Sequence, residues 1–237
     1  MRAAIEVKGV CKKFGNKVIY DGLDINIAEG ECVGFIGGNG TGKSVLFQLI
    51  TGLLPVDAGT VNVNGKILGE KTDFPEDVGV LINSPGYIDC YSGFRNLQML
   101  AGIQGKIGDQ EIRAAMKLVG LDPENKTKVK KYSMGMKQKL GLAQAIMEHQ
   151  KIIILDEPYN ALDYNTNREI TRVLKELKEE GITILLTSHQ HEYLEKLCDT
   201  MYFIVDGKVE LFDEERKREY FAIWLRKGGY ECHRIRL

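Results

Sequence analysis

The sequence predicts an α/β fold built around a mostly parallel β-sheet. Short apolar runs, which are typical of buried strands, alternate along the chain with stretches of helical periodicity. One such run, at residues 32–36, leads through a glycine-rich loop directly into a helical pattern. A second run, at residues 151–155, ends in two consecutive acidic residues. A central strand that delivers carboxylates to the C-terminal edge of a parallel sheet has this form.

Two predicted hairpins form an antiparallel β subdomain near the N-terminus. Residues 3–10 and 17–27 alternate apolar and polar side chains on either side of Gly15 and Asn16, which are typical turn residues. Residues 60–67 have the pattern of a second hairpin. These strands are expected to lie apart from the parallel sheet that follows them in the sequence.

The whole chain, residues 1–237, is expected to form a single domain. With 237 residues and a hydrophobic content of 43%, it can bury one substantial core. Helical patterns predict a small helical subdomain at about residues 84–148 and a helical tail at residues 213–237. The further predicted strands are residues 78–82, 182–188, 200–205 and 208–212, and the further predicted helices are residues 45–50, 92–121, 133–148 and 165–181.

Composition and charge argue against several classes of protein. The net charge is −1, so there is no electrostatic case for nucleic-acid binding. The five cysteines are scattered and include no C-x-x-C pair, which indicates reduced thiols in a cytosolic protein. The first residues lack the apolar core of a signal peptide, and no apolar run approaches the ~18 residues that span a bilayer. If the protein works at a membrane, we expect another polypeptide to span it.

The glycine-rich loop at residues 37–44 has the pattern G-x-x-x-x-G-K-[ST], which is typical of phosphate binding. Its glycines let the backbone curl so that successive N–H groups point at an anion, and the following helix adds its positive N-terminal end. Lys43 can reach the outer phosphates, and the hydroxyl of Ser44 can bind a magnesium ion. A glycine-rich turn that matches by chance is the alternative, but the flanking strand and helix disfavour it.

The second strong indication of function in the sequence is a pair of consecutive acids, Asp156 and Glu157. An acid at the end of an apolar strand can hold magnesium, and a second acid beside it can polarise the water that attacks a γ-phosphate. The alternative is a strand that simply ends at a polar surface. Gly37, Asn83 and His189 also follow predicted strands, so we expect all five residues to gather at one edge of the sheet.

Other features have two interpretations each. Phe14 lies near the first hairpin turn, where it can stack on a nucleobase or simply pack against the protein. The basic run at residues 126–131 favours a solvated face. His189 and His191 suggest a metal pair, but no third ligand is evident. The tail around Trp224 is expected to dock on the core, rather than pair with a second subunit or lie on a membrane.

The order of motifs along the chain resembles that of the ATP-binding subunits of ABC transporters. The resemblance covers about residues 4–212, and residues 79–86 and 132–138 look most like the bacterial branch that exports bacitracin or lantibiotics for self-protection. The motifs that carry it are the loop at residues 37–44, Ser133-Met134-Gly135-Met136 at a helix start, Leu155-Asp156-Glu157-Pro158, Ala161-Leu162-Asp163, and a strand that ends in His189.

The resemblance implies a P-loop NTPase core that binds ATP and Mg²⁺, with a role for each matching residue. Lys43 would contact phosphate, Ser44 and Asp156 would hold Mg²⁺, Glu157 would be the catalytic base, and His189 would contact the γ-phosphate. Phe14 would stack on adenine, and Asp163 would communicate across a dimer. The remaining nucleotide-binding positions would be Gly37, Gly38, Asn39, Gly40, Thr41, Gly42, Val45 and Asn83, with Ser133 and Gly135 contacting the nucleotide of the opposite subunit.

The resemblance also implies the assembly. Two subunits, identical or related, would sandwich two ATP molecules head to tail, and their closing motion would drive a separate transmembrane permease. The protein would then be cytoplasmic and peripheral on the inner face of the cell membrane. No nucleic-acid partner is expected.

Three positions depart from the common family pattern. Met134 replaces a glycine of the signature segment, Asn83 stands where glutamine or glutamate is usual, and Val45 stands where threonine is common. The amide of Asn83 has a shorter arm than that of glutamine, so we expect weaker coupling between nucleotide and partner. Two alternative functions stay open: an ABC-type ATPase that serves a soluble assembly or a nucleic-acid machine, and an ATP-gated switch without hydrolysis.

Overall fold

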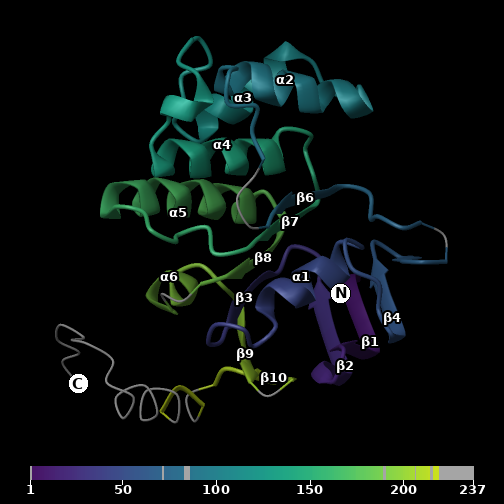
Figure 1. Cartoon of the computed structure of the whole chain (residues 1–237). Coiled ribbons are helices and arrows are strands. Elements are labelled where there is room, and N and C mark those ends of the chain that lie inside the picture. Colours follow the sequence, from purple (N-terminus) through teal and green to yellow (C-terminus); the bar gives the residue numbers. More distant parts are fainter. Residues whose placement is uncertain are drawn as a thin grey trace.

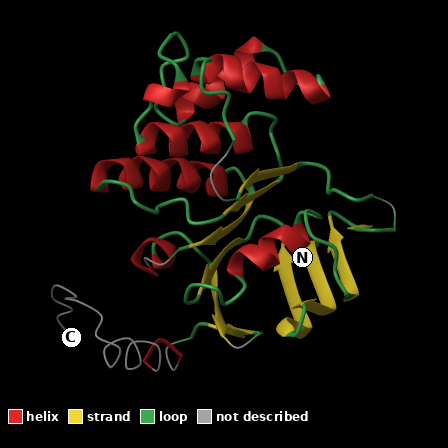
Figure 2. Ribbon diagram, viewed as in Figure 1, coloured by secondary structure: helices red, strands yellow, loops and turns green. Residues whose placement is uncertain are grey.

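Two β-sheets with helices around them organise the chain, and the predicted α/β fold is confirmed (Figures 1 and 2). The computed structural model describes residues 2–70, 72–82, 86–188, 191–205, 207–213 and 216–218. Most of the predicted tail helix, with Trp224, therefore lies outside the described residues, as do Asn83, His189 and Cys232. The four described cysteines are free thiols.

The smaller sheet is antiparallel and comes from the N-terminal part of the chain. Its order is β2-β1-β4-β5, with β1 at Ala3–Phe14, β2 at Lys17–Ala28, β4 at Ala58–Val63 and β5 at Lys66–Ile67. Both predicted hairpins are confirmed, although β1 continues four residues beyond the predicted end. Gly15 takes a φ of 57° in the first turn, which glycine adopts without strain.

The larger sheet has six strands in the order β10-β9-β3-β8-β7-β6. The pairs from β9 to β6 are parallel, and only β10 runs antiparallel to its neighbour. Because β3, β7 and β8 are buried along their whole length, their sequences are continuous apolar runs rather than alternating ones. The strands are β3 at Cys32–Ile36, β6 at Val78–Leu81, β7 at Ile152–Leu155, β8 at Thr183–Thr187, β9 at Thr200–Val205 and β10 at Lys208–Leu211.

The helices α2, α3 and α4 lie together at one end of the molecule, with α5 beneath α4 in Figure 1. The predicted helical stretch at residues 92–121 is two helices, because Gly105 takes a left-handed conformation at the end of α2. The short helix α6 was not predicted. The helices are α1 at Lys43–Ile50, α2 at Gly93–Gln104, α3 at Asp109–Leu118, α4 at Met134–Ile146, α5 at Tyr164–Glu179 and α6 at His191–Glu195.

The basic run at residues 126–131 crosses a 3₁₀ turn at Val129–Lys131 before α4 begins. Val129 is fully buried, whereas all the lysines of the run are exposed. The prediction of a solvated basic face is therefore confirmed.

The central strands divide their side chains between two cores. On β3, Cys32 and Ile36 belong to a core shared with the helices α2 to α5, whereas Val33 and Phe35 belong to a core shared with α1 and the antiparallel sheet. β7 is divided in the same way. Since side chains alternate along a strand, one buried strand joins both cores and its end is held from two sides.

A close approach of backbone to backbone holds β6 against α4. A Cβ atom at Gly79 would lie 1.8 Å from the carbonyl oxygen of Ala145, so only glycine fits there. By contrast, a Cβ at Gly102, on the exposed face of α2, would meet nothing within 4 Å.

We therefore expect Gly79→Ala to lower the free energy of unfolding by about 1–3 kcal/mol, because the strand and the helix must move apart. Gly102→Ala is the matched control and is expected to raise it by about 0.5–1 kcal/mol, since alanine favours helix. Urea denaturation of the three proteins measures both changes. A Gly79→Ala protein as stable as the original chain would show that α4 does not pack this closely on β6.

Candidate functional site

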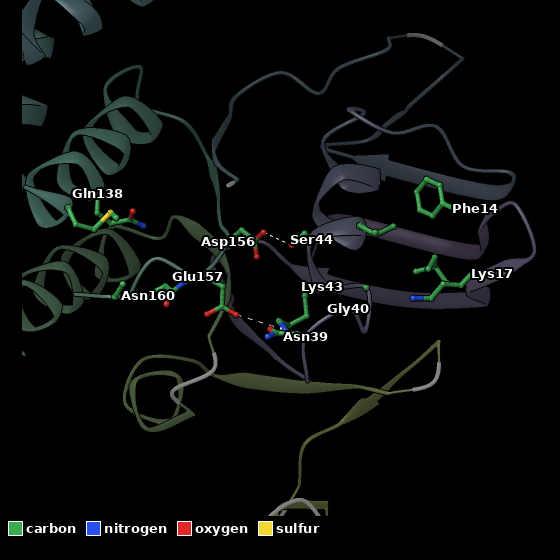
Figure 3. A pocket seen from close by; sticks show the side chains of 15 residues that line it. Phe14, Lys17, Asn39, Gly40, Lys43, Ser44, Gln138, Asp156, Glu157 and Asn160 are labelled. Atoms are coloured by element: carbon green, nitrogen blue, oxygen red, sulfur yellow. Dashed lines mark hydrogen bonds and ion pairs between the residues drawn. The ribbon is translucent and has the colours of Figure 1, made fainter. Parts of the chain in front are cut away.

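A cavity of about 720 Å³ opens at the carboxyl ends of β3 and β7 (Figure 3). These ends carry the glycine-rich loop and the acid pair, so the predicted gathering at one sheet edge is found for the described residues. The cavity is lined by Phe14, Lys17, Ile19, Asn39, Gly40, Gly42, Lys43, Ser44, Val45, Met134, Gln138, Asp156, Glu157, Asn160 and Ala161.

The loop at residues 37–44 needs glycine at two positions for different reasons. A Cβ at Gly37 would lie 2.7 Å from the carbonyl oxygen of Ile204 on the neighbouring strand. Gly42 has a φ of 113°, which side-chain-bearing residues rarely adopt, and it stands immediately before α1. The loop therefore lies tightly against the sheet at one end and turns sharply into the helix at the other. Thr41 closes it from within by donating a hydrogen bond to the carbonyl of Gly38 at 3.0 Å.

Lys43 is the buried cation of the site. It is only 7% exposed, and its Nζ donates hydrogen bonds to the carbonyl oxygens of Gly37 at 2.8 Å and Gly38 at 3.0 Å. Burial lowers the pKa of Lys43, and the nearby carboxylates of Glu157 and Asp156 partly oppose that shift. A buried ammonium held by neutral carbonyls at the mouth of a cavity is well placed to receive an anion.

Asp156 is the buried carboxylate of the site, and both of its oxygens are engaged. Oδ2 accepts a hydrogen bond from the hydroxyl of Ser44 at 2.6 Å, and Oδ1 accepts one from Thr187 at 2.7 Å. Ser44 and Asp156 also line the cavity, so a hydroxyl and a carboxylate oxygen lie side by side next to the phosphate loop. Magnesium prefers such hard oxygen ligands and completes its shell with phosphate oxygens and water, so these two residues fit that ion.

Glu157 directs its carboxylate into the cavity, with Oε1 3.9 Å from Nζ of Lys43 (Figure 3). Its backbone has a φ of 50°, an uncommon conformation for a residue other than glycine. The backbone N–H of Glu157 donates to the hydroxyl of Thr187 at 2.8 Å. Such strained backbone persists where the surrounding structure holds it in place, and functional sites are where it clusters.

Sequence reasoning missed two residues that support the site, Thr187 and Tyr20. Thr187 is fully buried at the end of β8 and contacts both acids. The hydroxyl of Tyr20, on β2, donates to the carbonyl of Gly42 at 2.9 Å, and burial raises its pKa so that it remains a donor. The sequence contained no signal for either, because each resembles an ordinary buried strand residue.

Phe14 ends β1 at the edge of the cavity, where its side chain is 48% exposed. It belongs to neither core cluster of the described chain. The ammonium of Lys12 lies 5.5 Å from the centre of its ring. A flat aromatic surface at the rim suits stacking on a base.

Ser133, Gly135 and Asp163 lie outside the cavity lining, where α4 and α5 begin. Ser133 is exposed and caps α4, and Asp163 is exposed and caps α5 by accepting hydrogen bonds from the hydroxyl and N–H of Thr166. Those two bonds lower the pKa of Asp163. Gly135 allows close packing, since a Cβ there would lie 3.1 Å from Thr166 Oγ1.

Within the described part of the chain, the structure contains no helix with the length and apolar character needed to cross a bilayer.

Comparison with known proteins identifies the family. The family described as ABC transporter matches residues 20–160, more than half of the chain. The bacitracin transport ATP-binding protein BcrA of Bacillus licheniformis is 34% identical over 223 residues, which cover 92% of this chain and 73% of that protein. The lantibiotic transport ATP-binding protein SrtF of Streptococcus pyogenes is 31% identical over 210 residues, which cover 89% and 90%.

A solved structure has the same fold. It is a dimeric post-hydrolysis state of an ATP-binding cassette bound to ADP and Pi, with a TM-score of 0.77 and 23% identity over 87% of this chain and 96% of that one. The resemblance inferred from the sequence motifs is confirmed by the family match and by both relatives. The chain therefore belongs to the ABC transporter family, as an ATP-binding protein with the fold of an ABC ATPase.

Proposed function

We propose that this ABC ATPase energises export through a separate transmembrane permease, and that the cargo is a peptide antibiotic or a related drug. The observation that carries the site assignment is the convergence of Lys43, Asp156 and Glu157 on one cavity beside the phosphate loop. The cargo class rests on the relatives whose names specify bacitracin and lantibiotic transport.

Nucleotide binding begins at the loop. The phosphates of ATP enter the curl at residues 37–44, where the N-terminus of α1 adds its positive end. Lys43 exchanges the carbonyls of Gly37 and Gly38 for phosphate oxygens, which form stronger, charge-assisted hydrogen bonds. Phe14 stacks on the adenine at the cavity rim.

Ser44 and Asp156 are the residues that hold Mg²⁺, which when bound neutralises charge on the phosphates. Glu157 orients the attacking water and accepts its proton. In the structure its carboxylate faces Lys43, so an arriving phosphate competes for that ammonium and leaves Glu157 available to water. His189, which lies outside the described residues, is assigned to the γ-phosphate by the resemblance alone.

Two subunits, identical or related, are proposed to close around two ATP molecules. Ser133 at the exposed start of α4 and Gly135 beside it then contact the nucleotide of the opposite subunit, and Asp163 takes part in the same interface. The helical group at about residues 84–148 and the rest of the chain act as one ATP-binding domain, cytoplasmic and attached to the inner face of the membrane through the permease.

Purification of the tagged chain from detergent extracts tests the transport assignment. A polytopic membrane protein recovered in stoichiometric amount is the expected result. Recovery of a soluble complex alone, from membranes that contain the protein, would instead favour the ATPase of a soluble assembly.

Lys43→Ala removes the buried ammonium from the loop. We expect ATP affinity to fall about 10- to 100-fold, because hydrogen bonds from a charged donor to phosphate are lost. Titration of a fluorescent ATP analogue measures the change, with Lys175→Ala on the exposed face of α5 as the control. Unchanged affinity in Lys43→Ala would show that the loop does not bind phosphate.

Glu157→Gln keeps the size of the side chain but cannot accept a proton. We expect ATP turnover to fall about 100-fold or more while ATP still binds, so that an ATP-bound dimer accumulates. Phosphate release and size-exclusion chromatography with ATP measure the two effects, and Glu179→Gln at the exposed end of α5 is the control. A monomer that retains the original turnover would remove Glu157 from this role.

A further inference from the structure

One buried hydroxyl connects the two acids of the site. Thr187 is the last residue of β8 and is 0% exposed. Its Oγ1 donates to Oδ1 of Asp156 at 2.7 Å and accepts from the backbone N–H of Glu157 at 2.8 Å. A hydroxyl has one proton to donate and lone pairs to accept, so both bonds form at once.

The bond to Asp156 determines how its carboxylate is turned. Thr187 holds Oδ1, while Ser44 holds Oδ2 at 2.6 Å from the side of the phosphate loop. A carboxylate that accepts a hydrogen bond at each oxygen is held in one rotational orientation. Without Thr187, Oδ1 would be a buried charged acceptor lacking this donor, and the group would turn to find another.

The bond to Glu157 supports an uncommon backbone conformation. Glu157 has a φ of 50°, and its N–H points at Thr187 rather than into the solvent. A buried N–H without an acceptor is costly, so losing Thr187 removes one reason for the chain to keep this conformation. The carboxylate of Glu157 would then shift relative to Lys43, which now lies 3.9 Å from it.

We propose that Thr187 is a positioning residue that places the carboxylate of Asp156 and the backbone of Glu157 relative to each other. The proposal rests on the roles given above to the two acids. Parallel pairing of β7 with β8 brings the two strand ends together. Leu155 pairs with Leu186, and the next residues along the two strands are Asp156 and Thr187. Thr187 contacts neither nucleotide nor water in this role, and acts through the acids.

Thr187→Val tests this directly, because valine fills the same volume and forms neither bond. We expect kcat to fall about 10- to 100-fold, since a small displacement of catalytic groups is enough to cause such losses. KM for MgATP is expected to rise less than kcat falls, because the phosphate loop is untouched and only the contribution of Mg²⁺ to binding is weakened. Thr187→Ser retains the hydroxyl and should recover most of kcat.

Thr183→Val is the matched control on the same strand. Thr183 is 2% exposed, and its hydroxyl also accepts a backbone N–H, from Gly30 at 2.9 Å, at the end of β8 remote from the cavity. Thermal unfolding should show that Thr183→Val loses stability as Thr187→Val does. Its kcat should nevertheless stay at that of the original chain. Equal loss of kcat in both variants, or an unchanged kcat in folded Thr187→Val, would overturn the proposal.

A binding measurement separates this proposal from the assignment of hydrolysis. The gain in ATP affinity on adding Mg²⁺ should shrink in Thr187→Val and not in Thr183→Val, while affinity in EDTA stays the same in both. If the original chain shows no ATP turnover, the role of Glu157 fails. If Mg²⁺ raises the ATP affinity of Thr187→Val as much as it raises that of the original chain, the role of Thr187 is separately overturned. Should Thr187→Val not fold, Thr187→Ala removes the same hydroxyl without branching and is judged by the same criteria.

Discussion

The parallel pairing of β3, β8 and β7 is the constraint on which the site depends. Cys32 pairs with Ile184 on one side of β8, and Ile152 pairs with Thr183 on the other, so the three strands end at nearly the same level. Because apolar side chains bury both faces of these strands, their register is strongly specified. The phosphate loop and the acids are thereby brought together although more than a hundred residues separate them in the sequence.

The charges at this edge are arranged for binding rather than for stability. A buried ion pair is weak evidence for stability, because removing both charges from water costs as much as their attraction returns. Lys43 and Glu157 are also 3.9 Å apart, a loose contact, and the lysine bonds mainly to loop carbonyls. These partners are easily exchanged for phosphate oxygens. The phosphate therefore meets a cation that is already in place and largely buried.

Sequence patterns predicted the architecture well because buried parallel strands and glycine loops are local signals. The strand before Gly37 and the strand before Asp156 are each visible within a few residues. α6 was missed since five residues are too few to show helical periodicity. Thr187 and Tyr20 were missed for another reason: their partners lie some twenty to thirty residues away, and only the folded strands bring the hydroxyls to them.

The described helices also hold the segment at residues 86–88 next to α4, which lines the cavity with Met134 and Gln138. The hydroxyl of Tyr87 donates to the carbonyl of Lys137 in α4 at 3.0 Å, and the amide of Asn96 in α2 bonds to both backbone groups of Ile88. This segment is thus tied to the helix that presents Ser133 at its start. The path from residues 86–88 to α4 therefore depends on Tyr87, on Asn96 and on the backbone groups that they bind.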